Sequence, residues 1–310
     1  MQMQLGERLR LTLFGTSHGP RVGALLEGVP KGLRVDETAI AQAMATRRPG
    51  GRYASKRKEQ DCVEFLSGIV EGKTTGASIE LSIENQDAKS KDYNFLPPHP
   101  RPGHQDMVMH KRTNGEADLR GGGSSSARLT AALVASAALL SPLLKPLGIQ
   151  CEAQVGAIGT VEALSMDDCP PRWENEDCQE MRCRDPAAAS KMVETVEQHR
   201  MGRNSIGSRV DLRVTGVPLG LGEPWFDGLE PALARAMMSI PAARGVVFGR
   251  GFDVVQMTGL EHNDAWGGSS ERPELIGANP DGVIAGLATG SPIHVSIAFK
   301  PPSSIATEQH

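Results

Sequence analysis

The sequence predicts an α+β fold in which one β-α-β arrangement occurs twice. The chain of 310 residues holds 35 glycines and only 4% aromatic residues, a composition that favours a loop-rich α/β or α+β protein. Two motifs also recur in the same order, first at 27–33 and 215–221, then at 68–83 and 282–297. Two duplicated β-α-β halves, with helices packed against sheets, account for this order.

The recurring motifs are short, but two different ones recur in the same order. EGVPKGL returns as TGVPLGL, and GIVEGKTTGASIELSI returns as GVIAGLATGSPIHVSI with identity at seven of sixteen positions. We expect each copy of the longer motif to form a hairpin, because β-branched strands flank a Thr-Gly turn. Coincidence in a glycine-rich chain is the alternative. The common order favours duplication, with internal repeats at about 20–145 and 208–310.

The ends and the apolar segments point to a soluble protein. Residues 1–15 alternate polar and apolar side chains as a strand does, and they lack the apolar stretch of a signal peptide. The most apolar run, 129–144, contains two serines and a proline and is too short to span a bilayer. A net charge of −4 gives no basic footprint for nucleic acid. We expect one domain over 1–310, located in the cytoplasm, with no nucleic-acid or membrane partner.

A segment at 151–203 separates the two repeats. Three of the five cysteines lie in its stretch DDCPPRWENEDCQEMRCRDP, with spacings that fit no zinc site, so free thiols are favoured over a metal centre. A helix follows, because Asp185 is a suitable N-cap, Pro186 suits the first helical position and Gly202 suits the end. We expect another helix over about 125–145. Its counterpart in the second repeat is missing, because the chain stops at His310.

Three segments carry the candidate chemistry. The stretch RRPGGRYASKRK at 47–58 gathers six basic residues around Pro49 and two glycines, which favours an anion-binding loop, although charge runs often only cover the surface. Two histidines follow glycine-rich or proline-rich loops, His18 in FGTSHGPR and His104 in PPHPRPGHQD, and each has an arginine nearby. Histidine titrates near neutral pH, so both are candidates for acid-base work.

The stretch GGGSSSAR at 121–128 predicts an anion cradle. Glycines allow close backbone approach, serines donate hydrogen bonds, and a helix N-terminus attracts negative charge. It is neither a Walker loop nor a dinucleotide fingerprint, and a flexible joint is the alternative. KPPSS at 300–304 offers similar groups after the second repeat. Several arginines, two loop histidines and two serine-rich segments together fit the binding of one or two polyanionic small molecules, one of them phosphorylated.

These motifs together resemble one family. FGTSHG, RRPGGR, RPGHQD, GGGSSSAR, SIPAARG, EHND and FKPPSS occur in the order found in chorismate synthases, from Phe14 to Ser304. The resemblance implies a β-α-β sandwich and a homotetrameric lyase of the shikimate pathway to aromatic amino acids. Such an enzyme converts 5-enolpyruvylshikimate 3-phosphate to chorismate by anti-1,4-elimination of phosphate and requires reduced FMN. NADPH is a candidate source of the reducing equivalents, and a separate flavin reductase is another.

The resemblance also assigns residues. His18 and His104 are then catalytic, His18 toward the departing phosphate and His104 toward the reduced flavin. The substrate-binding residues would be Arg47, Arg48, Arg52, Arg101 and Arg128. The FMN-binding residues would be Ser124, Ser125, Ser126, Pro241, Ala242, Ala285, Lys300, Pro301, Pro302, Ser303 and Ser304. No metal is expected.

Several positions depart from the family pattern. Ser124 stands where the family has an arginine, Ala285 where it commonly has glycine, and Pro302 where it has a threonine. A GRHDP loop and its following helix do not occur before His310, which agrees with the helix missing from the second repeat. The alternative function is therefore a truncated or degenerate homologue that binds FMN or anionic ligands without turnover.

Overall fold

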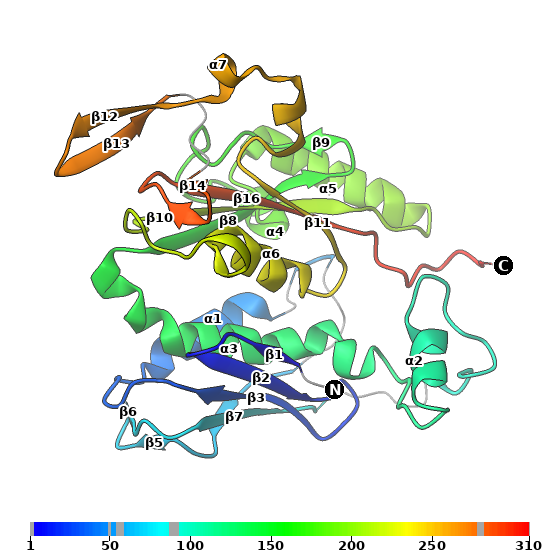
Figure 1. The fold of residues 1–310 in the computed structure, drawn as a ribbon. Coiled ribbons are helices and arrows are strands. Elements are labelled where there is room, and N and C mark those ends of the chain that lie inside the picture. The colour runs from blue at the N-terminus through cyan, green and yellow to red at the C-terminus, as the bar shows by residue number, and fades with distance from the viewer. Residues whose placement is uncertain (1–2, 49–50, 54–58, 87–92, 278–281, 310) are drawn as a thin grey trace. The chain divides into compact units, whose positions relative to one another are not determined.

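A computed structural model describes residues 3–48, 51–53, 59–86, 93–277 and 282–309 (Figure 1). Contacts divide the chain into two compact units, Met1–Pro142 and Leu143–His310, and each is described by itself. Each unit combines an antiparallel sheet with separate helices, which confirms the α+β class. Within the described ranges, no helix has the length and apolar character that a membrane span requires.

Unit 1 packs helices on a five-stranded antiparallel sheet of order β1-β2-β3-β7-β4. Its elements are β1 (Gln4–Leu5), β2 (Arg10–Gly15), β3 (Arg21–Glu27), α1 (Glu37–Arg47), β4 (Val63–Phe65), β5 (Ile69–Val70), β6 (Lys73–Thr74), β7 (Ile79–Glu84), α2 (Asp106–Arg112) and α3 (Thr130–Leu140). In Figure 1, α1 and α3 lie together over the sheet, and α3 contacts β3 and β7.

The core of unit 1 follows from alternation along its central strands. Val22, Ala24 and Leu26 of β3 point to one face and are fully buried, as are the alternate residues of β7. Because strand side chains alternate between faces, this single apolar face is what the helices cover. The facing side of α3 carries buried alanines, including Ala131 and Ala135, which let the helix approach the sheet closely.

The α-helix predicted over 125–145 begins later and ends earlier. Two 3₁₀ turns, Gly123–Ser125 and Ala127–Leu129, precede α3, with Ser126 in an extended conformation between them. The chain therefore enters the helix only at Thr130. The expectation that the glycine-serine stretch lies directly at a helix N-terminus was wrong, so the dipole of α3 acts at Thr130 and not at the serines.

The predicted hairpins exist, but their turns lie elsewhere. The pairing of β5 with β6 places the turn at Glu71–Gly72 and not at Thr75–Gly76. The equivalent ladder of unit 2, β14 (Val283–Ile284) with β15 (Leu287–Ala288), turns at Ala285–Gly286. All four turn residues have positive φ, between 49° and 87°, as a tight two-residue hairpin turn requires.

The repeated motifs also bond to each other in the same way. In unit 1, the Thr74 N–H donates to the carbonyl of Leu33 (2.9 Å). In unit 2, the Ala288 N–H donates to the carbonyl of Leu221 (2.8 Å). These equivalent bonds support the predicted duplication. Duplication and a single domain over 1–310 stay predictions.

Unit 2 contains a second five-stranded antiparallel sheet, of order β11-β16-β10-β8-β9. Its further elements are β8 (Gln150–Ile158), β9 (Val161–Glu162), α4 (Glu176–Met181), α5 (Pro186–Met201), β10 (Ser208–Thr215), α6 (Leu229–Met238), β11 (Ala243–Phe248), α7 (Gly259–His262), β12 (Ala265–Ser269), β13 (Arg272–Ile276) and β16 (Ile293–Phe299). Within this unit, α5 packs on β8 and β9, α6 packs beside β11, and β12 with β13 forms a separate hairpin (Figure 1).

The sequence prediction for α5 is confirmed. Asp185 accepts hydrogen bonds from the backbone N–H groups of Ala187 (3.0 Å) and Ala188 (3.1 Å), Pro186 is the first helical residue, and Gly202 follows the last. The N-terminal end of α5 is therefore set by two neighbouring residues, the N-cap aspartate and the proline at the first helical position.

The cysteines of the segment between the repeats yield a testable prediction. Cys178 and Cys183 are fully buried, and burial raises the pKa of Cys183 to about 11. Only the thiolate reacts, and its fraction at about pH 8 is on the order of 0.1% for such a pKa. We expect a disulfide reagent to label the exposed Cys62 and Cys151 in the native protein and the buried pair only after unfolding. Rapid native labelling of Cys183, detected by peptide mapping, would contradict this.

Candidate functional site

His18 is held against the glycine stretch of unit 1. It follows β2, and the preceding Ser17 donates its backbone N–H to the carbonyl of Gly123 (3.1 Å) and its hydroxyl to that of Arg120 (3.4 Å). Gly121 has φ +60°, and a Cβ there would lie 2.6 Å from Ser17 Oγ and 2.7 Å from His18 Cε1. Glycine is therefore needed at position 121 because any side chain would collide with the loop of His18. From sequence, the reason expected for this glycine is close approach to a bound anion.

His104 lies in a buried hydrogen-bond cluster. Its Nδ1 is 2.6 Å from Oδ1 of Asp106, and Arg101 donates to the same carboxylate from its backbone N–H, Nε and Nη2. Burial alone would raise the pKa of Asp106, but the hydrogen bonds from Arg101 and the nearby positive charges lower it overall. Arg101 Nη2 also donates to the carbonyls of Leu119 (3.2 Å) and Gly121 (2.6 Å). The two histidine loops thus meet at one glycine.

Tyr93 connects the two histidine loops a second time. Its ring meets the ring of His18 edge-on at a centroid distance of 4.9 Å. The guanidinium carbon of Arg101 lies 5.3 Å from the same ring, within the range of a cation–π contact. The predicted residues His18, Arg101 and His104 are therefore brought together within unit 1.

Arg47 and Arg128 belong to another buried cluster, centred on Asp61. Arg128, with a side chain only 5% exposed, forms ion pairs with Asp61 and Glu59. Arg47 Nη1 donates to the other oxygen of Asp61 (2.6 Å), and burial lowers the pKa of Arg47. Arg128 Nε also donates to Asn85 (2.8 Å). In this structure both guanidinium groups form ion pairs with acidic side chains of the protein itself. The role of Arg47 and Arg128 in substrate binding stays a prediction.

Asn85 joins this second cluster to the first. Its amide nitrogen donates to the carbonyls of Thr16 (3.0 Å) and Gly19 (2.8 Å), which flank His18. The other predicted arginines, Arg48 and Arg52, are exposed on the basic loop. The remaining residues proposed for that loop, Pro49, Gly50, Lys56, Arg57 and Lys58, lie outside the described residues.

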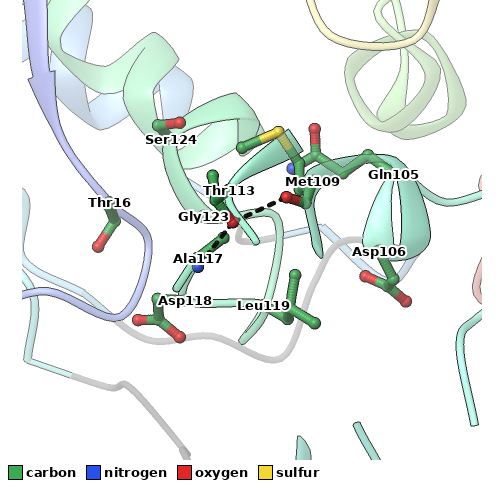
Figure 2. Close-up of a pocket in the computed structure, with 10 residues that line it drawn as sticks. All are labelled: Thr16, Gln105, Asp106, Met109, Thr113, Ala117, Asp118, Leu119, Gly123 and Ser124. Carbon is green, nitrogen blue, oxygen red and sulfur yellow. Dashed lines mark hydrogen bonds between the residues drawn. The ribbon is translucent and has the colours of Figure 1, made fainter. Parts of the chain in front are cut away.

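Ser124, the first of the three serines, lines a pocket of about 220 Å³, shown in Figure 2. Its walls come from α2 and the segments on either side of it, from the loop after β2 and from the glycine-serine stretch. The lining residues are Thr16, Gln105, Asp106, Met109, Thr113, Ala117, Asp118, Leu119, Gly123 and Ser124. Ser126 uses its hydroxyl to cap the Arg128 N–H (3.2 Å). The hydroxyls of Ser124 and Ser125, by contrast, have no hydrogen-bond partner within the described ranges, so they can donate to a ligand.

The pocket also carries a fixed negative charge. Arg120 donates to Asp118 through its side chain (2.7 Å from Nε), and this bond lowers the pKa of Asp118 although partial burial opposes it. The positive charge of His18 lowers the pKa of Asp118 further. With Asp106 in the same wall, this corner of the unit is polar and ionised.

The predicted cofactor residues of unit 2 fall into two places. Lys300 donates its backbone N–H to the carbonyl of Ala242 (3.0 Å), which joins the 241–242 and 300–304 segments, and its Nζ donates to Ser303 (3.1 Å). Ala285 lies instead in the β14–β15 turn, whose Gly286 accepts from the first residue of α6. Gly286 thus contacts the N-terminal end of α6, whereas Ala242 follows its C-terminal end. Whether these residues share one cofactor site stays a prediction.

Comparison with known proteins decides the family. A model of the family described as chorismate synthase matches residues 9–310. The chain is 45% identical over 97% of its length to a chorismate synthase of Aeropyrum pernix, covering 80% of that protein, and 41% identical over 98% to one of Methanosarcina mazei, covering 83%. The chain belongs to the chorismate synthase family. Its expected enzyme class, a lyase, is confirmed with it.

The fold agrees with this family. A solved structure titled a crystal structure of chorismate synthase matches with a TM-score of 0.76 and 29% identity, over 94% of this chain and 84% of that one. The predicted chorismate synthase-like fold is confirmed. The alternative of a degenerate binding protein is not favoured by relatives this similar over nearly the whole chain.

Sequence reasoning missed the acids and the aromatic residue that organise this chorismate synthase site. Asp106 stands two residues after His104 in RPGHQD, and Asp61 closely follows the basic run 47–58. A search of the sequence for acidic residues near the predicted histidines and arginines would have found both. Tyr93 had no such signal, because it lies in a loop without a motif.

Proposed function

We propose that this chain catalyses the anti-1,4-elimination of phosphate from 5-enolpyruvylshikimate 3-phosphate to give chorismate, with reduced FMN as cofactor. The observation that supports this most is that the loops of His18 and His104 meet at Gly121, which packs on His18 and accepts from Arg101 of the His104 cluster. The hydroxyls of Ser124 and Ser125, which have no hydrogen-bond partner among the described residues, lie in the same glycine-serine stretch. Two titratable groups at one loop suit a reaction in which a phosphate leaves and a proton is lost.

The elimination balances without a net oxidant. The carbon–oxygen bond to phosphate breaks, and phosphate leaves with the electron pair of that bond. The carbon–hydrogen bond in the 1,4-position breaks, the existing ring double bond shifts, and one further carbon–carbon double bond forms. The hydrogen leaves as a proton, which would pass to the bound reduced cofactor. Reduced FMN, when bound, supplies electron density to the substrate during this step. His18 would donate a proton to the departing phosphate, and His104 would hold a proton beside the flavin.

The anion-binding residues would serve the charges of the two ligands. Arg101, held at the glycine loop, and the loop arginines Arg48 and Arg52 would face the carboxylates and phosphate of the substrate, with Arg47 and Arg128 behind them. Ser124 and Ser125 fit hydrogen bonds to FMN, because their hydroxyls are available. Ser126, the segments 241–242 and 300–304, and Ala285 complete the proposed cofactor set.

Further properties rest on the family resemblance. We propose a homotetramer, with NADPH or a separate flavin reductase supplying the reducing equivalents. The cytoplasmic location expected from sequence stays a prediction.

An anaerobic assay with the substrate and chemically reduced FMN tests the proposal. Chorismate and phosphate should appear in equal amounts. His18→Ala and His104→Ala should each reduce kcat by about 10²–10⁴-fold, the usual contribution of general acid–base catalysis. His199→Ala is the matched control, because His199 lies on α5 of unit 2 and, among the described residues, its ring bonds only to the Thr195 carbonyl (2.8 Å). Absence of product with wild-type protein, or full activity in both variants, would refute the proposal.

A further inference from the structure

Asp106 is the most heavily used acceptor in the neighbourhood of the two histidines. Its side chain is only 1% exposed, and its carboxylate accepts from Arg101 N (2.9 Å), Nε (2.9 Å) and Nη2 (2.6 Å) as well as from His104 Nδ1 (2.6 Å). Oδ2 serves the first two donors, and Oδ1 serves the other two. Both oxygens are therefore committed.

This arrangement fixes which nitrogen of His104 carries the proton. An ionised carboxylate can only accept hydrogen bonds, so the nitrogen facing it must donate. The neutral ring of His104 is thus the tautomer with the proton on Nδ1. Its Nε2 has no hydrogen-bond partner among the residues that the structure describes, and the side chain is 22% exposed. Nε2 is consequently the nitrogen available to exchange a proton with a ligand.

The same carboxylate also orients the ring relative to His18. Arg101, clamped by Asp106, donates to the carbonyl of Gly121, and Gly121 packs on His18. The guanidinium of Arg101 lies against Tyr93, which meets His18 edge-on. A change at Asp106 would therefore release His104 and loosen the loop that holds His18.

We infer that Asp106 is a positioning residue, which holds His104 in the Nδ1–H tautomer and aims Nε2 at the reacting molecules. The inference rests on the proposed function for its catalytic meaning, but the tautomer is a property of the protein alone. Hydrogen bonds from Arg101 lower the pKa of Asp106, so its carboxylate stays ionised at the pH of any enzymatic assay.

Asp106→Asn tests the inference because it keeps the shape and removes one acceptor. Arg101 N and Nε both require the remaining amide oxygen, so the new NH₂ group takes the place of Oδ1, which served His104 Nδ1 and Arg101 Nη2. The NH₂ group forces Nδ1 to accept, while Arg101 Nη2 loses this acceptor and keeps the carbonyls of Leu119 and Gly121. The proton of the neutral ring should then move to Nε2. We expect ring ¹⁵N NMR at alkaline pH to show Nδ1–H in the wild type and Nε2–H in the variant, with the signal assigned by His104→Gln.

Kinetics provide the second measurement. With the tautomer reversed, kcat should fall about 10- to 100-fold, as is typical when an orienting partner is lost, while KM for the substrate changes about threefold or less. Asp106→Glu, which keeps the charge, should retain the Nδ1–H tautomer and recover part of kcat. A structural role alone would lower folded yield without moving the ring proton.

Asp118→Asn is the matched control. Asp118 lines the same pocket and is paired with an arginine, but it makes no contact with His104. It should leave the His104 tautomer unchanged. A wild-type ring protonated on Nε2 would overturn the inference without any variant, and so would an unchanged tautomer in folded Asp106→Asn. If the wild type shows the expected tautomer but makes no chorismate, the proposed function fails and the assignment of Asp106 stands.

Discussion

Asp61→Asn should lower the melting temperature of the protein by about 6–20 °C at neutral pH. Asp61 is 4% exposed and holds Arg47 with one oxygen and Arg128 with the other. Removing one partner from a buried ion pair leaves uncompensated charge and costs about 3–5 kcal/mol. A shift of about 2–4 °C per kcal/mol then applies to a domain of this size. Scanning calorimetry at neutral pH measures the change.

Two variants separate the charge from other effects. Asp61 has φ 52°, a left-handed conformation that asparagine tolerates and alanine does not, so Asp61→Asn removes the charge with little backbone strain. Asp61→Ala should be less stable still. Glu64→Gln removes an ion pair with Arg21 in which Glu64 is 52% exposed, and it should cost about 1 kcal/mol or less. Equal shifts for Asp61→Asn and Glu64→Gln would show that the buried cluster is not a source of stability.

Local signals explain why part of the fold could be predicted. The bounds of α5 followed from Asp185, Pro186 and Gly202, because each residue type acts on the backbone beside it. The same reasoning failed at Ser125, where glycines and serines favoured a helix start but the chain forms two 3₁₀ turns first. At the hairpins, a Thr-Gly pair looked like the turn, whereas strand register placed it at Glu71–Gly72.

The candidate site could be located from sequence but not assembled. Motifs singled out His18, His104 and Arg101, because glycine-flanked or proline-flanked histidines stand out in one dimension. The partners that set their geometry depend on tertiary contacts: Tyr93 reaches His18 across 75 positions of sequence, and Arg128 reaches Asp61 across 67. Sequence shows that an arginine is present but not which acid it contacts, so the ion pairs of Arg128 with Asp61 and Glu59 could not be predicted.

Gly121→Ala should reduce kcat about 100-fold or more while leaving the protein folded. The new Cβ would lie 2.6 Å from Ser17 Oγ and 2.7 Å from His18 Cε1, both shorter than real contacts allow, so the histidine must move. A displacement of about 1 Å in a catalytic group can cost about 10²-fold in rate. The carbonyl of Gly121 also accepts from Arg101 (2.6 Å), so the loop of His104 would move with it.

Gly72→Ala distinguishes displacement from backbone strain. Gly72 has φ +70°, close to the +60° of Gly121, but a Cβ there would meet nothing within 4 Å. In both variants the alanine must adopt a left-handed conformation, which lowers the free energy of unfolding by about 1–2 kcal/mol. Only in Gly121→Ala does the new Cβ also displace His18. We expect both variants to remain folded at the assay temperature, with Gly121→Ala melting lower because its contacts with Ser17 and His18 add to the backbone strain. Only Gly121→Ala should lose kcat. Equal activities in the two would mean that contact with Gly121 does not set the position of His18 during catalysis.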